Sequence, residues 1–274
     1  MAYQIKYAYT CHIGKIRNNN EDNFWCCGEF LNAQNQGMSH IQSGCRKQSE
    51  LPVMAVFDGM GGESCGEMAA FLATESCDLH YQEEKEHIRR EGNKFLVDAC
   101  ERMNQAICDY GRENRIDSMG TTAAMLAFGE EFVYGCNLGD SRIYRSSSEK
   151  FYQISEDHTL GRHFLGKAPL TQYLGMQEEN LKLEPSVSVY PITEGDRYLI
   201  CSDGITDMLS DGEIADIFTR EIPIEETVQV LVERALKKGG RDNITVILCE
   251  VMSQKENWWK RMWKQLKRHE GEIS

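Results

Sequence analysis

Carboxylates recur along the chain in five short acidic motifs, and four of these motifs follow or close an apolar stretch. The motifs are Arg17–Asn23, Ala55–Gly62, Asn137–Arg142, Cys201–Gly204 and Arg241–Asn243. A buried strand that ends in Asp-Gly delivers a carboxylate to the rim of a sheet, and the glycine lets its backbone carbonyl approach a ligand closely. Hard divalent cations bind to oxygen-rich rims of this kind. The motifs therefore predict one metal site assembled from distant segments.

The chemistry that such a site supports is the hydrolysis of a phosphate ester. We expect Asp58, Asp203 and Asp242 to converge, with Asp22 close by. Carboxylates in one pocket repel and raise one another's pKa unless cations neutralise them. Two Mg²⁺ or Mn²⁺ ions ~3.5–4 Å apart can share a bridging water, turn it into hydroxide and stabilise an in-line attack on phosphorus. Arg17 can grip two phosphate oxygens in a fork, which lysine does less well.

Each motif taken alone also has a simpler explanation. An Asp-Gly at the end of a strand is most often a turn whose side chain caps its own backbone, and this applies to Asp58, Asp140 and Asp203. Arg17 alone would be an ordinary surface ion-pair residue. The joint occurrence favours the metal site, because independent turns have no reason to reproduce an ordered set.

Strands and helices must carry these motifs to one place. Apolar and β-branched runs predict strands over 3–9, 24–27, 52–57, 123–128, 132–137, 142–145, 151–154, 187–190, 197–201 and 244–251. Helical spacing predicts helices over 66–81, 95–110, 211–218 and 225–238. We also expect a hairpin loop over 33–50, a turn at 58–62, an antiparallel meander over 123–154 and an irregular excursion over 155–183. Consecutive hairpins with helices inserted in pairs predict an α+β fold, with two antiparallel sheets covered by helices.

Length and composition indicate one domain over residues 1–252 and a tail over 253–274. The net charge of −13 argues against nucleic acid as a partner, because phosphate backbones attract clustered Lys and Arg. No apolar stretch approaches a membrane span of ~20 residues, so we expect a cytoplasmic protein. The eleven cysteines are odd in number and lie mostly in apolar runs, which predicts reduced core residues.

The motifs resemble, in the same order, those of the metal-dependent Ser/Thr protein phosphatases of the type 2C family, in their smaller bacterial form. The similarity spans roughly residues 5–251 and includes Thr121–Thr122, the turn Gly139–Arg142 and the closing motif Gly240–Asn243. It implies a four-layer α-β-β-α sandwich and a centre of two Mn²⁺ or Mg²⁺ ions with a weaker third. It also implies phosphorylated proteins as substrates and a Ser/Thr kinase as the opposing partner.

The resemblance further implies a role for each motif residue. In these roles Asp58 bridges both ions, the Gly59 carbonyl binds one of them, and Asp203 and Asp242 complete the ligands of the two ions. Asp22 and Glu21 act partly through bound water, and Asp140 joins Asp203 on the third cation. Arg17 binds the phosphate, and Asn243 supports the site. Without a base beside them, Thr121 and Thr122 are expected to pack rather than to act as nucleophiles.

The chain departs from the family where many relatives have a histidine after Asp-Gly, because Met60 occupies that position. Protonation of the leaving alkoxide would then fall to a metal-bound water, with His158 or His163 as alternatives. The excursion over 155–183 resembles a shortened substrate flap. Two other functions stay open: a catalytically silent scaffold that binds phosphoproteins, and a phosphatase acting on a small metabolite.

The tail predicts a basic amphipathic helix over residues 257–268. One face carries Trp258, Trp259, Met262, Trp263 and Leu266, and the other carries Lys260, Arg261, Lys264, Lys267 and Arg268. Such a helix can lie on the anionic inner face of a membrane or bind an acidic partner. It can equally fold back onto its own acidic domain, because a helix pattern does not name what its apolar face meets.

Overall fold

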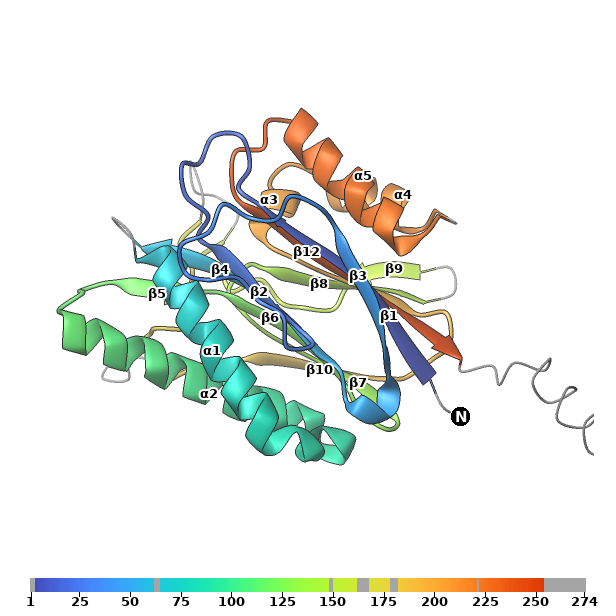
Figure 1. The fold of residues 1–274 in the computed structure, drawn as a ribbon, viewed down its shortest axis with the longest axis horizontal. Helices are drawn as coiled ribbons and strands as arrows, with labels where there is room; N and C mark the ends of the chain where they lie inside the picture. The colour runs from blue at the N-terminus through green and yellow to red at the C-terminus, as the bar shows by residue number, and fades with distance from the viewer. Residues whose placement is uncertain are drawn as a thin grey trace, which may run out of the picture.

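The computed structural model of the chain describes residues 3–61, 65–147, 150–161, 168–177, 182–220 and 222–253. Within these residues, two antiparallel sheets pack face to face between two layers of helices (Figure 1). This arrangement confirms the predicted α+β fold and its four-layer α-β-β-α sandwich.

The first sheet has the strand order β3-β1-β12-β11-β8-β9. Its strands are β1 (Tyr3–His12), β3 (Gln42–Lys47), β8 (Arg142–Ser147), β9 (Lys150–Gln153), β11 (Arg197–Cys201) and β12 (Ile244–Ser253). At its centre β1 and β12 pair along their whole length, from Tyr3 opposite Ser253 to His12 opposite Ile244. The two ends of the described chain therefore lie next to each other in one sheet.

The second sheet has the strand order β10-β7-β6-β4-β2, and a short strand, β5, pairs with the end of β4. Its strands are β2 (Asp22–Cys26), β4 (Val53–Gly61), β5 (Met119–Thr121), β6 (Ala123–Phe128), β7 (Phe132–Leu138) and β10 (Ser186–Pro191).

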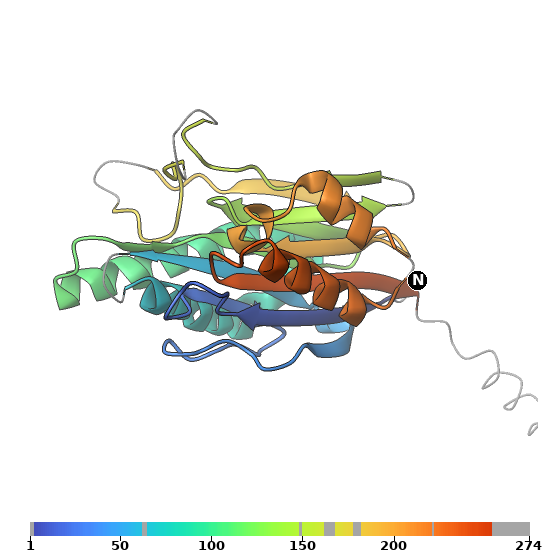
Figure 2. The same cartoon turned by 90° about the horizontal axis from the view of Figure 1, so that it is seen from above.

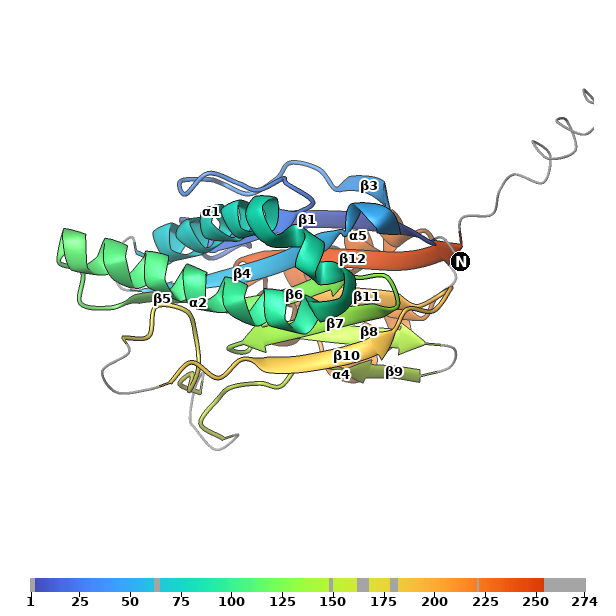
Figure 3. The same cartoon turned by 90° about the horizontal axis from the view of Figure 1, so that it is seen from below.

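Helices cover the outer face of each sheet. The second sheet is covered by α1 (Gly66–Glu84) and α2 (Ile88–Asn114), which are joined by the 3₁₀ turn η2 (Lys85–His87) (Figure 3). The first sheet is covered by α3 (Asp203–Thr206), α4 (Asp211–Phe218) and α5 (Ile224–Lys237) (Figure 2). A second 3₁₀ turn, η1 (Gln48–Glu50), precedes β4.

Three apolar layers hold these elements together, and the strands contribute to two layers at once. On β4, Met54 and Val56 pack between the sheets, whereas Ala55 and Phe57 pack against α1 and α2. Side chains of a strand alternate between its faces, so a strand covered on both faces is apolar throughout. This explains why the strands that carry the motifs have continuous apolar sequences. All eleven cysteines are free and most are buried, as predicted.

Two predicted loops are wrong because strands occupy them. The stretch 33–50 contains β3, an edge strand whose polar residues are mostly exposed and whose backbone pairs with β1. Its residues show no apolar alternation, so no periodicity marks it. The predicted turn at 58–62 is also wrong over its described part, because β4 continues to Gly61 and pairs with β5.

The predicted meander over 123–154 is wrong as a single unit. β6 and β7 form a hairpin in the second sheet, whereas β8 and β9 form a hairpin in the first. The chain crosses between the sheets at Gly139–Ser141, where Gly139 has φ +94°, a conformation that favours glycine. Strand periodicity predicts strands but not the sheet to which each belongs, which is why the crossing was missed.

The other predicted strands and helices are confirmed, although α2 begins at Ile88 rather than at residue 95. The described parts of 155–183 contain isolated bridges but no strand or helix, as expected. Strand β12 ends at Ser253, and residues 254–274 lie outside the described residues, so the domain boundary and the tail helix stay predictions. In the part of the chain that the structure describes, no helix combines the length and apolar character needed to span a bilayer.

Candidate active site

The acidic motifs lie where strands of the two sheets begin or end. Asp22 at the start of β2 lies directly opposite Asp58 on β4. In the other sheet, Asp203 follows β11 and Asp242 precedes β12, and these two strands pair with Cys201 opposite Val246. The motifs thus come from both sheets, as the predicted convergence requires.

Asn243 ties the first motif to the last. Its side-chain Oδ1 accepts a hydrogen bond from the Glu21 backbone amide at 2.8 Å. Its Nδ2 donates to the carbonyls of Ile13 and Asn19 at 2.9 and 3.0 Å. Asn243 is 2% exposed, so these hydrogen bonds are largely shielded from water. Asn243 therefore holds residues 13–21 against the turn before β12, and its supporting role in catalysis stays a prediction.

Arg17 lies beside the carboxylates at the open side of the site. Its guanidinium donates to Asp242 Oδ2 at 2.8 Å and lies 3.8 Å from Glu21 Oε2. The Arg17 side chain is 42% exposed, whereas the Asp242 and Glu21 side chains are 21% and 16% exposed. A guanidinium placed in this way can be reached by an anionic group from solvent.

Asp22 lies deeper than the other motif residues and is 2% exposed. Its Oδ2 accepts hydrogen bonds from Ser202 Oγ and Thr245 Oγ1, both at 2.7 Å. Burial, followed by the charges of Asp203 and Asp242, raises the pKa of Asp22 to about 7, although the two hydroxyls lower it. The sequence analysis gave no role to Ser202, although it lies inside the motif Cys201–Gly204, and it missed Thr245, which lies two residues after Asn243. Their closeness to the motif residues in the sequence is the signal that could have found them.

The backbone around Asp58 and Gly59 is fixed on both sides. The Asp58 backbone amide donates a hydrogen bond to Thr122 Oγ1 at 3.0 Å, and the Thr122 backbone amide donates one to the Asp58 carbonyl at 2.9 Å. The Gly59 amide donates to the Glu21 carbonyl at 3.1 Å. A Cβ on Gly59 would lie 2.1 Å from the Gly66 carbonyl oxygen, so only glycine fits this close approach. The buried Thr122 hydroxyl thus positions the motif, which matches its expected packing role.

The structure also brings Asp140 towards Asp203. Both line a cavity of about 670 Å³ together with Asp157 and Arg241. Asp203 begins α3 directly after β11 and is 2% exposed. A Cβ on the next residue, Gly204, would lie 1.9 Å from the Asn243 carbonyl oxygen, so the two motifs touch through their backbones.

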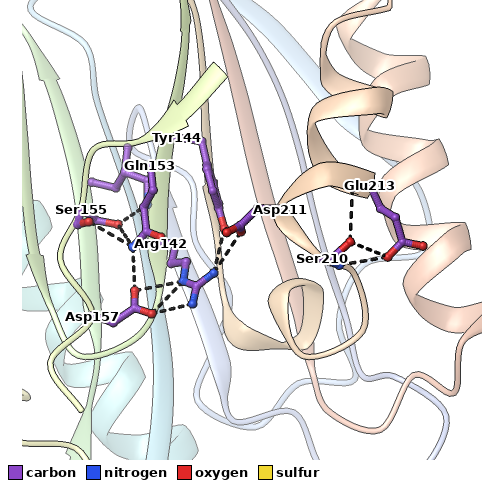
Figure 4. A network of polar contacts seen from close by, with 9 residues as sticks. Arg142, Tyr144, Gln153, Ser155, Asp157, Ser210, Asp211 and Glu213 are labelled. Atoms are coloured by element: carbon purple, nitrogen blue, oxygen red, sulfur yellow. Dashed lines mark hydrogen bonds and ion pairs between the residues drawn. The ribbon is translucent and has the colours of Figure 1, made fainter. Parts of the chain in front are cut away.

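A polar network beside this cavity fixes the segment that follows β9 (Figure 4). Arg142 donates to Asp157 through Nε at 2.9 Å and through a terminal nitrogen at 2.5 Å. It also donates to the Tyr144 hydroxyl at 3.0 Å and to Asp211 at 3.2 Å. Arg142 thereby connects β8, the 155–157 segment and the first turn of α4. Sequence reasoning placed this arginine in a motif but gave it no role.

His158 is held by the turn that carries Asp140. Its Nδ1 accepts a hydrogen bond from the Gly139 amide at 3.2 Å, and its own amide donates to the Gly139 carbonyl at 3.0 Å. Burial lowers the pKa of His158, which favours the neutral ring that this contact requires. These contacts support a structural role. His163, the other histidine considered, lies outside the described residues.

The residues at this end of the sandwich fit hard divalent cations by their donor chemistry. The carboxylates of Asp58, Asp203 and Asp242 and the Gly59 carbonyl supply oxygen only, which suits Mg²⁺ and Mn²⁺. Because Gly59 has no side chain, the carbonyl oxygens of Gly66 and Glu21 can lie close to its backbone. Over the described ranges, however, no three His, Cys, Asp or Glu side chains are already gathered into a metal-binding group. Individual ligand assignments therefore stay predictions.

The family of the chain follows from comparison with known proteins. A family model described as Protein phosphatase 2C matches residues 36–246. The chain belongs to the protein phosphatase 2C family. Together with the relatives below, this confirms the inferred resemblance and makes the chain an enzyme, a protein serine/threonine phosphatase of a metal-dependent family.

Named bacterial phosphatases are similar over most of the chain. Protein phosphatase PhpP from Streptococcus pneumoniae is 31% identical over 208 residues, which cover 71% of this chain and 83% of that protein. Serine/threonine phosphatase stp from Listeria monocytogenes is 30% identical over 250 residues, which cover 86% of this chain and 92% of that protein.

Solved structures show the same fold. The serine/threonine phosphatase PstP/Ppp from Mycobacterium tuberculosis superimposes with a TM-score of 0.73 at 26% identity, over 91% of this chain and 100% of that one. A PstP catalytic domain in complex with two manganese ions has a TM-score of 0.70 at 28% identity, over 92% of this chain and 100% of that one.

Proposed function

We propose that the enzyme hydrolyses phosphoserine and phosphothreonine in proteins with the help of two Mn²⁺ or Mg²⁺ ions. The proposal rests mainly on the position of acidic motifs from both sheets at one end of the sandwich. Asp22 lies opposite Asp58, and the Glu21 amide is hydrogen-bonded to the Asn243 side chain. Similarity to named serine/threonine phosphatases supports the substrate class, and the two manganese ions of the related PstP domain support the metal.

The residues that would hold the cations are Asp58, the Gly59 carbonyl, Asp203 and Asp242. When bound, such a pair supplies a lowered pKa for water and neutralises charge on the phosphate. Asp22 is proposed to act behind these ligands, because its buried Oδ2 is already held by two hydroxyls. A weaker third cation is proposed for Asp140 and Asp203, which line one cavity.

Arg17 is proposed to bind the phosphate group. Its planar guanidinium can donate two parallel hydrogen bonds to phosphate oxygens. It lies at the exposed side of the site and is already oriented by Asp242 and Glu21. The same two carboxylates keep the guanidinium in place before the substrate arrives, which reduces the entropy lost on binding.

Protonation of the leaving serine or threonine oxygen is proposed to come from water. Met60, which lies on β4 opposite Gly120, carries no proton to donate. The His158 ring accepts a hydrogen bond from the Gly139 amide through Nδ1, which ties it to the turn. We therefore assign no side chain of the described residues as the general acid.

The partners proposed for the enzyme are phosphoproteins and an opposing Ser/Thr kinase, and the proposed location is the cytoplasm. Contact with the inner membrane face through residues 257–268 remains a prediction, because these residues lie outside the described ones.

The test is a phosphate-release assay on a panel of phosphoserine and phosphothreonine peptides, with Mn²⁺ titrated against a chelator. We expect release that rises with Mn²⁺, stops with chelator and falls at least about 100-fold in Asp58→Asn. Metal-dependent release from small phosphorylated metabolites alone would contradict the protein substrate. No release from either class, together with intact binding of a phosphoprotein, would indicate the scaffold instead.

A further inference from the structure

A groove of about 890 Å³ runs between α5 and residues 38–41, apart from the catalytic end of β4. In Figure 1, α5 lies above β1 and β12 and beside the segment that leads into β3. Met38, Ile41 and Val230 are half-buried residues of this groove, and each packs on one of the apolar layers below it. The groove thus offers an apolar floor that is open to solvent.

Glutamates line the α5 side of the groove. Glu225, Glu226 and Glu233 all belong to it, and Glu226 and Glu233 are exposed. Glu225 is paired with Lys6 at 2.9 Å. Glu233 lies 3.7 Å from Lys237, an exposed pair that contributes little. The groove therefore combines apolar surface with a net anionic rim, which suits a basic amphipathic segment.

The C-terminal sequence of the chain has this composition. Residues 254–274 contain six Lys and Arg against three Asp and Glu, and three of the four tryptophans. The chain as a whole carries a net charge of −13 even though this segment is positive. Charge complementarity therefore pairs the segment with the acidic domain that precedes it.

The place where β12 ends allows this segment to reach the groove. Ser253, the last residue of β12, pairs with Tyr3 on β1. Lys6 lies three residues after Tyr3 on the same strand, about 10 Å from it, and forms an ion pair with Glu225 of the groove. The five residues from 254 to 258 span up to about 17 Å when extended. A helix over 257–268 would be about 18 Å long, close to the length of α5.

We propose that residues 254–268 dock in this groove of their own chain. In this arrangement the tryptophans cover the floor formed by Met38, Ile41 and Val230, and the basic side chains meet Glu226 and Glu233. The segment would then pack against α5 and not against a membrane. This proposal concerns a surface outside the catalytic site and does not depend on the proposed reaction.

The test compares the full-length protein with its double variant E226K/E233K and with the matched control E101K/E113K. The control changes the charge equally at exposed positions on α2. Tryptophan emission reports on docking, because Trp25 is fully buried and the other three tryptophans lie in the segment. Limited trypsin digestion reports on protection of the segment's lysines and arginines. Circular dichroism confirms that all three proteins are folded.

Docking predicts a red shift of tryptophan emission and a loss of trypsin protection in E226K/E233K, with no change in E101K/E113K. The emission should not depend on protein concentration. Identical spectra and digestion in all three proteins would overturn the proposal. Emission that shifts only with protein concentration would assign the groove to a second copy, and emission that shifts only with phosphatidylglycerol vesicles would assign the segment to a membrane; both outcomes also overturn it.

Discussion

The backbone amide of Glu21 donates a hydrogen bond to Asn243 Oδ1 at 2.8 Å, which joins residues 222 positions apart in the sequence. Glu21 precedes Asp22, and Asn243 follows Asp242. One buried amide side chain therefore fixes the distance between two acidic motifs that arrive from different sheets.

Asn243→Ala removes three hydrogen bonds, those with Glu21, Ile13 and Asn19. At about 1 kcal/mol each, we expect the free energy of unfolding to fall by about 2–3 kcal/mol in urea titrations. Activity should fall at least about 10-fold, because Asp242 loses its support. The control Asn114→Ala loses one exposed hydrogen bond and should change the free energy by less than about 0.5 kcal/mol. Equal stability of the two variants would contradict the proposed tie.

Asp58→Asn should retain the fold and lose Mn²⁺-dependent activity by at least about 100-fold. The amide of asparagine keeps the shape of the side chain but supplies one weaker ligand oxygen and no charge. The matched control is Asp109→Asn on α2, whose side chain is 46% exposed and pairs with Arg112, and it should leave the rate unchanged. An Asp58→Asn enzyme with wild-type turnover would show that this carboxylate has no part in catalysis.

Arg17→Lys keeps the positive charge but loses the planar fork. We expect kcat/KM on a phosphopeptide to fall about 10-fold for Arg17→Lys, and further for Arg17→Ala, which also loses the charge. The measurement is a steady-state titration of phosphopeptide at saturating Mn²⁺. If Arg17→Lys and Arg17→Ala lose equal activity, the fork and not the charge is essential; if neither loses activity, Arg17 does not bind the phosphate.

The network around Arg142 in Figure 4 should link stability to activity. Arg142→Gln leaves Asp157 without its charged partner, and we expect a loss of about 1–3 kcal/mol in unfolding free energy together with reduced activity.

The control variant is Ser210→Ala, which removes the N-cap of α4, because Ser210 Oγ accepts a hydrogen bond from the Glu213 amide. It should lower the unfolding free energy by about 1 kcal/mol without a change in rate. Thermal unfolding and phosphate release separate the two effects. Full activity in Arg142→Gln would show that this network serves the fold alone.

His80 should make the folded state less stable in acid. It is 3% exposed, and its Nε2 lies 3.0 Å from the Phe95 carbonyl. Burial, together with the charge of Arg102, lowers the pKa of His80 below its ordinary value of 6.5, although the Phe95 carbonyl raises it. The unfolded chain therefore binds more protons, and stability falls as pH drops through and below 6.5.

The test of this effect is His80→Gln, whose amide can still donate to the carbonyl. The loss of unfolding free energy between pH 7.5 and 5.5 should be smaller in His80→Gln than in the wild type. A pH dependence identical to that of the wild type would assign the acid sensitivity to other groups.

The sequence predicted the layers of this fold well, because the strands between sheets and helices are apolar on both faces. Phe57 and Val56 illustrate this, since they face different layers on one strand. It failed for β3, because the residues of this strand are mostly polar and exposed and show no apolar alternation. It also failed at Gly139, because local periodicity does not encode the sheet that the next strand joins.

The sequence indicated that the acidic motifs close or precede buried strands, and Asp22 does lie opposite Asp58 in the sheet. The grouping of the other carboxylates around one metal centre stays a prediction. The sequence did not predict the hydroxyls that hold Asp22, because Ser202 and Thr245 are ordinary residues until the fold aims them at a buried oxygen. Arg142 was likewise visible in a motif, yet its contacts with Asp157 and Asp211 depend on segments far away in the sequence. Long-range polar contacts depend on the topology of the sheets, which local sequence patterns do not predict.

Anomalous diffraction from crystals soaked in Mn²⁺ would show whether the carboxylates bind a pair of cations. We expect two manganese peaks ~3.5–4 Å apart at the end of the sandwich, with Asp58 between them and Asp203 and Asp242 on either side. Crystals of Asp58→Asn should lose at least one peak. A Mn²⁺-active wild-type enzyme whose crystals show no manganese near these three carboxylates would contradict the account.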